Sequence, residues 1–298
     1  MLDVRLLIID PQGSFCNDVP QDQQQSLHDG ELCVPGALDD MNRLAKMVDR
    51  IGHKIKDITV TMDSHPLGGL HIAHGCFFKN INTGDRPSPF TIITLDKSGS
   101  EPKIIGTIGS DTAEYVTAHP SFRVWTLEYL DNLETSGRYP HCIWPEHCII
   151  GTPGHLIVPE LRSALHNWGQ LNNGFVNVVT KGSNFRTEHF SAVRAEVPVP
   201  NDPTTQLNTD VIETFLDADL IGLSGEARSH CLANTVRDIA NEFVSGGQFG
   251  TNDEFIKKCV LLTDASSDVP TFEKLGNDFV DEMTSRGMKT ATTTDWLS

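Results

Sequence analysis

The sequence predicts an α/β protein built on a three-layer, doubly wound sheet of about six parallel strands, with helices on both faces. Short apolar runs without strict alternation, which are typical of strands buried on both faces, recur along the chain. These runs are residues 4–9, 57–62, 175–180, 219–224, 259–264 and, as a weaker match, 289–294. Segments with apolar residues at helical spacing lie between many of the runs, and such alternation of strands and helices indicates a parallel sheet.

Three predicted helices carry recognisable signals. The segment 35–51 opens with Pro35, and proline is favoured in the first turn of a helix. The segments 230–244 and 269–287 show the same apolar spacing, and the second of them ends at Gly287, a residue type that commonly follows a helix. Each of the three segments connects two predicted strands, as a doubly wound sheet requires.

Residues 66–140 interrupt this alternation of strands and helices, because they are rich in Gly, Pro and polar residues. Within them we predict a hairpin around 90–108 and a helical segment near 125–136. We interpret the part from about 75 to 140 as an insertion between the second and third strands of the sheet. No clear linker is present, so residues 1–298 are predicted to form a single domain.

Composition narrows the classes of function. The 298 residues carry a formal net charge of −17, which argues against nucleic acid and anionic membranes as partners. No apolar run reaches the roughly 18 residues of a membrane span, and the N-terminus lacks the basic region of a signal peptide. The seven cysteines are scattered and form no C-x-x-C, which argues against a disulfide framework and favours a reducing, cytoplasmic setting.

Polar side chains of catalytic type follow four of the predicted strands. Asp10 follows the first strand, Asp63 and His65 the second, and Lys181 ends the third. The fourth strand runs into GEARSHC, which places Cys231 at the start of the next helix. The carboxyl ends of parallel strands meet at one edge of a sheet, so we expect these groups to lie together.

Cys231 is a candidate nucleophile. The helix N-terminus and the cation of Lys181 would favour its thiolate, and Asp10 could accept the thiol proton and later donate it to a leaving amine. Backbone N–H groups of the turn and of Cys231 would face a substrate carbonyl oxygen. The alternative is that Cys231 is a small buried hydrophobic residue, which is the commoner situation for a single cysteine.

A second group of residues has the composition of a metal site. In MDSHPLGGLHIAH, Asp63 and His65 lie on the same side of an extended chain, and His71, His74 and the later His147 of IWPEHC could complete the ligand set. Mixed imidazole and carboxylate ligands suit zinc, iron or manganese. Alternatively, these histidines are ordinary surface residues or hydrogen-bonded core residues.

The order Asp10, Lys181, Cys231 resembles the triad of the nicotinamidase branch of the isochorismatase-like cysteine hydrolase family. LLIIDPQGSF looks like the opening strand of that family, and MDSHP looks like its metal-binding motif. WPEHCIIGTPG and TKGSNFRTEHFSA are similar to its W-P-x-H-C and K-G segments, which are the most specific of these motifs. The resemblance covers most of the chain and implies the isochorismatase-like hydrolase fold.

The resemblance also implies roles for residues around the nucleophile. It implies a cis peptide bond between Glu226 and Ala227, and an oxyanion hole formed by the backbone N–H groups of Ala227 and Cys231. Phe15 and Trp144 would lie on the two faces of a flat aromatic ring. For each of these two aromatic residues, the alternative is ordinary packing in the core.

The resemblance implies one divalent metal ion, with zinc expected and iron or manganese as alternatives. Its ligands would be Asp63, His65, His147 and one further histidine, for which spacing favours His71 over His74. The metal would hold the substrate by its ring nitrogen rather than activate a hydrolytic water.

The implied reaction is hydrolysis of nicotinamide to nicotinate and ammonia through a thioester on Cys231. The nucleophile turn, GLSGEARSHC, departs from the usual family pattern, and the insertion lengthens the chain. We therefore keep two alternatives: the same chemistry on another small amide or carbamoyl compound, and a non-catalytic binding protein of the same fold. We expect a small-molecule amide as partner, no nucleic acid or membrane, and a homo-oligomer.

Overall fold

A computed structural model describes residues 2–17, 30–243 and 254–298. Six parallel strands form the main sheet, in the order β11-β10-β9-β1-β2-β8. Their bounds are β1 Val4–Ile9, β2 Asp57–Asp63, β8 Asn177–Lys181, β9 Leu220–Gly225, β10 Cys259–Leu262 and β11 Lys289–Ala291. The six predicted strands are therefore confirmed, with β10 and β11 ending two to three residues earlier than expected.

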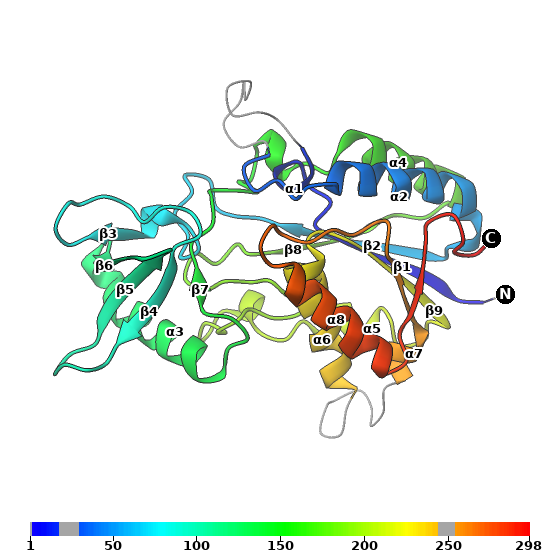
Figure 1. Cartoon of the computed structure of the whole chain (residues 1–298). Helices are drawn as coiled ribbons and strands as arrows, with labels where there is room; N and C mark the ends of the chain where they lie inside the picture. The colour runs from blue at the N-terminus through cyan, green and yellow to red at the C-terminus, as the bar shows by residue number, and fades with distance from the viewer. Residues whose placement is uncertain (1, 18–29, 244–253) are drawn as a thin grey trace.

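Helices cover both faces of this sheet (Figure 1). One face carries α2 (Ala37–Ile51) and α4 (Pro159–Asn172). The other carries α5 (Thr209–Glu213), α6 (Ala233–Glu242), α7 (Glu254–Lys258) and α8 (Glu273–Ser285). The predicted helix 230–244 is observed as a π-helical turn, η6 (Arg228–Leu232), followed by α6, and residue 244 lies outside the described residues.

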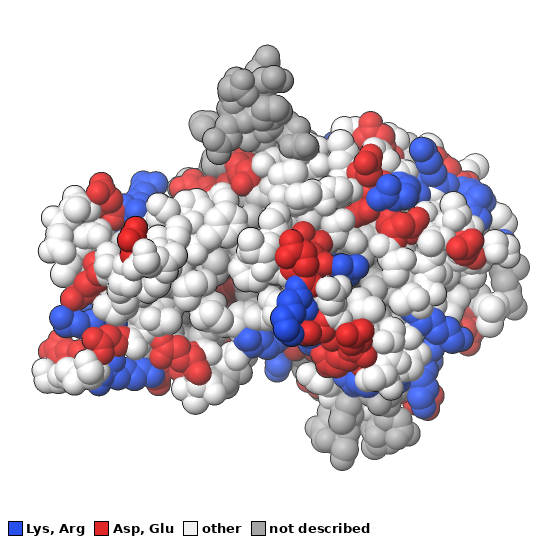
Figure 2. Space-filling view, viewed as in Figure 1, with Lys and Arg blue, Asp and Glu red and all other residues white. Residues whose placement is uncertain are grey.

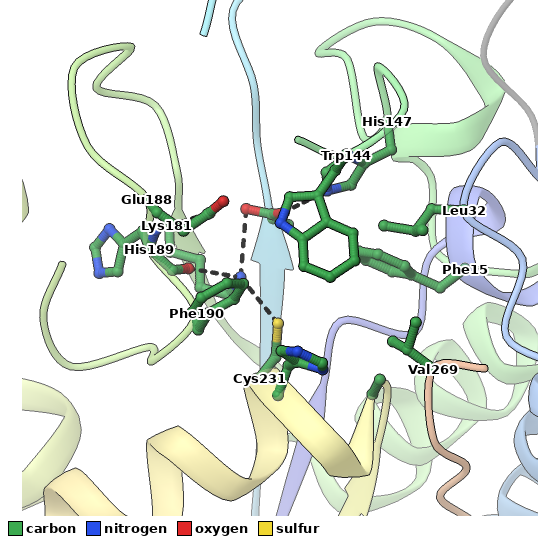
Figure 3. Close-up of a pocket in the computed structure, with 13 residues that line it drawn as sticks. Phe15, Leu32, Trp144, His147, Lys181, Glu188, His189, Phe190, Cys231 and Val269 are labelled. Carbon is green, nitrogen blue, oxygen red and sulfur yellow. Dashed lines mark hydrogen bonds and ion pairs between the residues drawn. The ribbon is translucent and has the colours of Figure 1, made fainter. Parts of the chain in front are cut away.

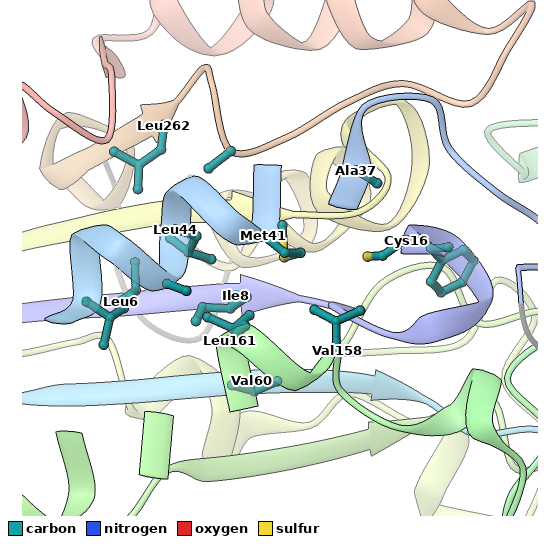
Figure 4. Packing of buried hydrophobic residues seen from close by; sticks show 14 of the residues in the cluster. Leu6, Ile8, Cys16, Ala37, Met41, Leu44, Val60, Val158, Leu161 and Leu262 are labelled. Carbon is teal, nitrogen blue, oxygen red and sulfur yellow. The ribbon is translucent and has the colours of Figure 1, made fainter. Parts of the chain in front are cut away.

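The strand β1 shows why the sheet is buried on both sides. Leu6 and Ile8 pack among Met41 and Leu44 of α2 (Figure 4), while Leu7 and Ile9 point to the opposite face and pack among the helices there. Because successive side chains of a strand alternate between faces, a run such as VRLLII must be apolar at consecutive positions. This burial supplies the hydrophobic stabilisation of the three layers.

The inserted segment forms a second, antiparallel sheet in the order β3-β6-β5-β4-β7. Its strands are β3 Phe78–Asn80, β4 Ile92–Asp96, β5 Lys103–Ile108, β6 Asp111–Thr117 and β7 His141–Cys142. The helix α3 (Arg123–Ser136) packs on it and shares a separate apolar core with it. The predicted hairpin is β4 and β5, and the predicted helix near 125–136 is α3.

Short helical turns lie between the longer elements. They are α1 Gly13–Cys16, η1 Gly52–Lys54, η2 Gly75–Phe77, η3 Pro120–Phe122, η4 Pro153–His155 and η5 Pro203–Thr205. No helix among the described residues has the length and apolar character that a bilayer crossing requires. On the face shown in Figure 2, Lys and Arg side chains lie interspersed with Asp and Glu side chains.

Candidate active site

The carboxyl edge of the main sheet brings the predicted triad together. Asp10 follows β1, Lys181 ends β8, and the turn after β9 leads to Cys231. The ammonium of Lys181 lies 2.9 Å from Asp10 Oδ2 and 3.7 Å from Cys231 Sγ. It also donates to the carbonyl of His189 at 3.0 Å and lies 3.3 Å from Asp63 Oδ1. Lys181 therefore links the triad to the second candidate group.

Burial controls the protonation of the triad. Burial lowers the pKa of Lys181, but the adjacent Asp10 and Asp63 carboxylates outweigh it and hold this pKa well above its usual value. Burial raises the pKa of Asp10, although Lys181 opposes the change and the Thr61 hydroxyl donates a hydrogen bond of 2.6 Å. Asp10 is therefore a stronger base than an exposed carboxylate.

The thiol of Cys231 is held in its protonated form. Burial raises its pKa well above the usual value, and a side-chain hydrogen bond with Asp10 adds to this, while Lys181 only partly opposes it. The expected thiolate character is thus not supported for the resting site. The geometry instead suits a neutral thiol that passes its proton to Asp10 during attack.

Three imidazole rings beside the triad have the arrangement of a metal site. One nitrogen from each of His65, His74 and His147 lies within 4.8 Å of the others. The Nδ1 atom of each ring contacts a backbone carbonyl, at 3.1 Å for Gly182, 2.7 Å for Gly69 and 2.8 Å for Pro145. A carbonyl can only accept, so each Nδ1 carries the hydrogen and, in the neutral ring, Nε2 is the nitrogen left to act as a metal ligand.

The carboxylate of Asp63 lies beside these imidazole rings. Its Oδ2 is 3.1 Å from His65 Nε2 and 3.3 Å from His147 Nε2. Burial would raise the pKa of Asp63, but His65 and Lys181 hold it well below the usual value. Nε2 of His74 is buried and has no hydrogen-bond partner among the described residues. This nitrogen, the Nε2 atoms of His65 and His147, and the carboxylate fit a divalent cation such as zinc, iron or manganese.

The structure distinguishes His71 from His74, the two histidines considered as the further ligand. His71 is buried and its ring centroid lies 4.3 Å from that of His65, but its Nδ1 accepts the backbone N–H of Ala73 at 3.2 Å. The neutral ring therefore carries its hydrogen on Nε2, which leaves no lone pair there for a metal. His74 has the opposite arrangement, so the geometry favours the alternative ligand.

A pocket opens beside Cys231 (Figure 3). Phe15 and Trp144, the predicted ring-binding residues, both line it, and the Phe15 ring lies edge-on to His147 with centroids 5.4 Å apart. The other lining residues are Leu32, Asp63, His147, Lys181, Glu188, His189, Phe190, Ala227, His230, Cys231 and Val269. The structure brings the two aromatic residues to the pocket, and their contact with a substrate ring stays a prediction.

Three polar pocket residues, Glu188, His189 and His230, were missed from the sequence. Glu188 is 6% exposed; its Oε1 accepts the N–H of His189 at 3.0 Å, and its Oε2 has no hydrogen-bond partner among the described residues. Burial raises the pKa of Glu188, and in Figure 3 its carboxyl group is directed into the pocket. Burial lowers the pKa of His230 to about 4, so this ring is neutral. The sequence signal that could have identified Glu188 was a glutamate close after the Lys181 motif.

The nucleophile turn has the backbone that the resemblance implied. The peptide bond between Glu226 and Ala227 is cis. The carbonyl of Ala227 accepts the N–H groups of His230 and Leu232, both at 3.1 Å, which fixes the turn around Cys231. The proposed oxyanion hole of Ala227 and Cys231 N–H groups stays a prediction.

Comparison with known proteins identifies solved structures that are similar to this fold. No family model matches the sequence, and no curated protein matches it. Among solved structures, the yeast nicotinamidase Pnc1p bound to the inhibitor nicotinaldehyde is 16% identical over 97% of this chain and 99% of that chain, with a TM-score of 0.58. The nicotinamidase pyrazinamidase of Acinetobacter baumanii is 17% identical over 100% of this chain and 99% of that chain, with a TM-score of 0.58.

The pyrazinamidase of Pyrococcus horikoshii in complex with zinc is also similar. It is 16% identical over 97% of this chain and 99% of that chain, with a TM-score of 0.51. At these identities the similarity shows the fold. The chain therefore has the three-layer fold of the nicotinamidases, as the sequence predicted.

Proposed function

We propose that this chain is a metal-dependent cysteine amidohydrolase and that its substrate is nicotinamide, which it hydrolyses to nicotinate and ammonia. The observation that carries the proposal is the position of Lys181, within 2.9 Å of Asp10, 3.7 Å of Cys231 and 3.3 Å of Asp63. A single buried cation thus joins a base, a thiol and a metal-ligand carboxylate at the edge of one pocket.

In the first half of the reaction, Asp10 accepts the proton of the Cys231 thiol as Sγ attacks the amide carbon. The N–H groups of Ala227 and Cys231 donate to the oxygen that becomes negative. Asp10 then returns the proton to the leaving nitrogen, the carbon–nitrogen bond breaks, and ammonia departs. Lys181 keeps its positive charge throughout and holds the Asp10 carboxylate and Cys231 Sγ in position.

In the second half, water attacks the thioester carbon and Asp10 accepts one of its protons. The carbon–sulfur bond breaks, the acid is released, and the proton on Asp10 restores the Cys231 thiol. The sum is one amide and one water converted to one acid and one ammonia. The raised pKa of Asp10 suits a group that must both accept and donate a proton near neutral pH.

The residues that would hold the metal are Asp63, His65, His74 and His147. When bound, a divalent ion would supply a Lewis acid that holds the ring nitrogen of the substrate. The pyrazinamidase of Pyrococcus horikoshii was solved in complex with zinc, which supports zinc as the first candidate here. The carbonyl contacts of the three Nδ1 atoms orient the rings for that role.

Phe15 and Trp144 support a flat aromatic substrate, because both rings line the pocket beside Cys231. One observation favours a second candidate, another small amide or carbamoyl compound. Glu188 directs a buried carboxyl oxygen without a partner among the described residues into this pocket, and such an oxygen would pair with a hydrogen-bond donor that nicotinamide lacks on its ring.

An ammonia-release assay tests the proposal. Purified protein is supplied with nicotinamide, with pyrazinamide and with a panel of small amides and carbamoyl compounds, and its metal content is measured in parallel. Ammonia from nicotinamide that Cys231→Ala does not release supports the proposal. Release only from other amides selects the second candidate, and no release from any compound overturns both. A cytoplasmic location and a homo-oligomer remain part of the proposal, tested by fractionation and by light scattering.

A further inference from the structure

We propose that a small cavity behind the active-site pocket binds ammonium, the nitrogen product of the proposed amide hydrolysis, between the carboxylates of Glu188 and Glu196. The cavity is distinct from the pocket that contains Cys231, but Glu188 and Phe190 line both of them. The inference rests on the proposed function in one respect, namely that ammonia is released beside Cys231.

The size of the cavity suits a very small ligand. It lies between the inserted segment, which contributes residues of α3 and β7, and the segment after β8 that carries the two glutamates. The centre of a water-sized particle can occupy about 10 Å³ in it, which is room for one such particle. Ammonium is close to water in size and fits this space, whereas an aromatic ring does not.

Each of the two carboxylates has an oxygen that lacks a partner. Glu188 is 6% exposed, and the side chain of Glu196 is 3% exposed. Oε2 of Glu188 and Oε1 of Glu196 are buried and have no hydrogen-bond partner among the described residues. A buried acceptor without a donor is destabilising, so both oxygens favour an occupant that donates hydrogen bonds.

The other polar side chains of the cavity wall have already used their hydrogens. His141 donates through Nε2 to a backbone carbonyl at 2.9 Å, and burial lowers its pKa to about 4, so its Nδ1 accepts from the Tyr129 hydroxyl at 3.3 Å. The Tyr139 hydroxyl donates to Asn234 Oδ1 at 3.2 Å. The wall therefore offers unpaired acceptors, which suit a pure donor such as ammonium better than water, since water must also accept.

The charges around the cavity are one positive charge short. Arg138 lies 3.5 Å from Glu196 Oε2 and 2.9 Å from Asp238 Oδ2, and Arg194 lies 3.2 Å from Asp238 Oδ1. With Glu188, two arginines face three carboxyl groups. Burial raises the pKa of Glu196 to about 7 although Arg138 opposes the rise, so Arg138 alone does not offset burial. A bound ammonium ion would hold both glutamates ionised and balance the charge.

The proposed reaction releases its nitrogen next to this cavity. Ammonia leaves the amide carbon beside Cys231, and the Glu188 carboxyl group is directed into the same pocket (Figure 3). Over one turnover near neutral pH, the acid product loses a proton and ammonia gains one. The sum is one amide and one water converted to one carboxylate and one ammonium ion. Binding of ammonium in the cavity removes the nitrogen from the thioester, which ammonia would otherwise attack to form the amide again.

The first test measures the midpoint of thermal unfolding, Tm, of the purified protein in the chlorides of ammonium, methylammonium, potassium and sodium at equal ionic strength. Ammonium should raise Tm by about 2 °C relative to sodium, because a ligand of the folded state stabilises it. Methylammonium is too large for the cavity and should match sodium. The same Tm in ammonium and sodium overturns the proposal. An equal shift in methylammonium or potassium also overturns it, because the site would then select neither size nor hydrogen-bond donors.

Variants locate the bound ion. Glu196→Gln keeps the shape of the side chain but removes its charge, and it should abolish the ammonium shift in Tm. Cys142→Met enlarges a different residue of the cavity wall and should also abolish it. Glu160→Gln, at an exposed glutamate of α4, is the matched control and should keep the full shift. A full shift in both cavity variants overturns the assignment to this cavity.

The second test measures formation of nicotinate from nicotinamide with added ammonium chloride. The inhibition constant of ammonium should be at least about tenfold higher in Glu196→Gln than in wild type or Glu160→Gln. Equal inhibition constants in the three proteins overturn the role in product release. If wild type hydrolyses no amide, the proposed function fails, while the Tm comparison still decides whether the cavity binds ammonium.

Discussion

Replacing Lys181 with Met tests the electrostatic centre of the site. The ammonium lies 2.9 Å from Asp10 and 3.3 Å from Asp63, and all three side chains are almost completely buried. Methionine keeps most of the length but removes the charge. Removing one member of a buried ion pair costs about 3–5 kcal/mol of stability. Part of this cost is avoided if Asp10 binds a proton, because Lys181 no longer opposes the rise in its pKa that burial causes.

The sign of the pH effect follows from these contacts. Asp10 must be deprotonated to accept the thiol proton, so a higher pKa of Asp10 moves the acid limb of kcat/KM to higher pH. Burial already raises the pKa of Cys231, and loss of Lys181 raises it further. At neutral pH the variant therefore has more protonated base and a less acidic thiol. We expect kcat/KM for nicotinamide to fall by about 10²–10⁴-fold.

The assay follows iodoacetamide labelling of Cys231 as a function of pH, resolved by peptide mass spectrometry because other cysteines are also free. The labelling profile of Lys181→Met should lie at higher pH than that of wild type, with unchanged metal content. Lys258→Met is the matched control, since Lys258 is a half-buried lysine that donates to Leu216 away from the pocket. Identical profiles in wild type and Lys181→Met would refute the reasoning and reduce the triad to a Cys–Asp pair.

The remaining predictions concern single side chains of the site. Cys231→Ala should lower ammonia release by more than about 10⁴-fold while calorimetry still detects nicotinamide binding; activity within about tenfold of wild type would exclude it as nucleophile. His74→Ala and His147→Ala should each weaken metal binding more than about tenfold by elemental analysis, whereas His71→Ala should retain the metal, and the opposite order would restore His71 as the ligand. Glu188→Gln should change the ratio of kcat/KM between nicotinamide and an amide with an amino group on the ring by about tenfold; equal changes for both would show that Glu188 does not contact the substrate.

The local sequence pattern was sufficient to predict the layers of this fold. The strand β1 is apolar at consecutive positions because its side chains enter two different cores, and this pattern is readable without a structure. The same holds for Asp10, Lys181 and Cys231. Each follows or ends a parallel strand, and the geometry of such sheets brings these positions to one edge.

The choice between His71 and His74 depended on tertiary structure. Both are histidines in one short motif, and their spacing carries no information on which nitrogen holds the hydrogen. That is decided by the backbone around them, since Ala73 donates to the ring of His71 while Gly69 accepts from the ring of His74. Only the folded backbone distinguishes the two rings.

The polar residues buried away from the motifs were likewise outside the reach of sequence reasoning. Glu188 and Glu226 belong to a residue type that is ordinarily exposed, so their sequence neighbourhoods predict solvent contact. Chain segments far apart in sequence bury both side chains, and burial raises the pKa of each carboxyl group. The sequence by itself determined the sheet and the sheet edge at which Asp10, Lys181 and Cys231 gather, because these follow from local patterns and strand order. The tertiary structure decided which imidazole nitrogens are available to a metal and which carboxyl groups have a raised pKa, because both depend on atoms that only folding brings into contact.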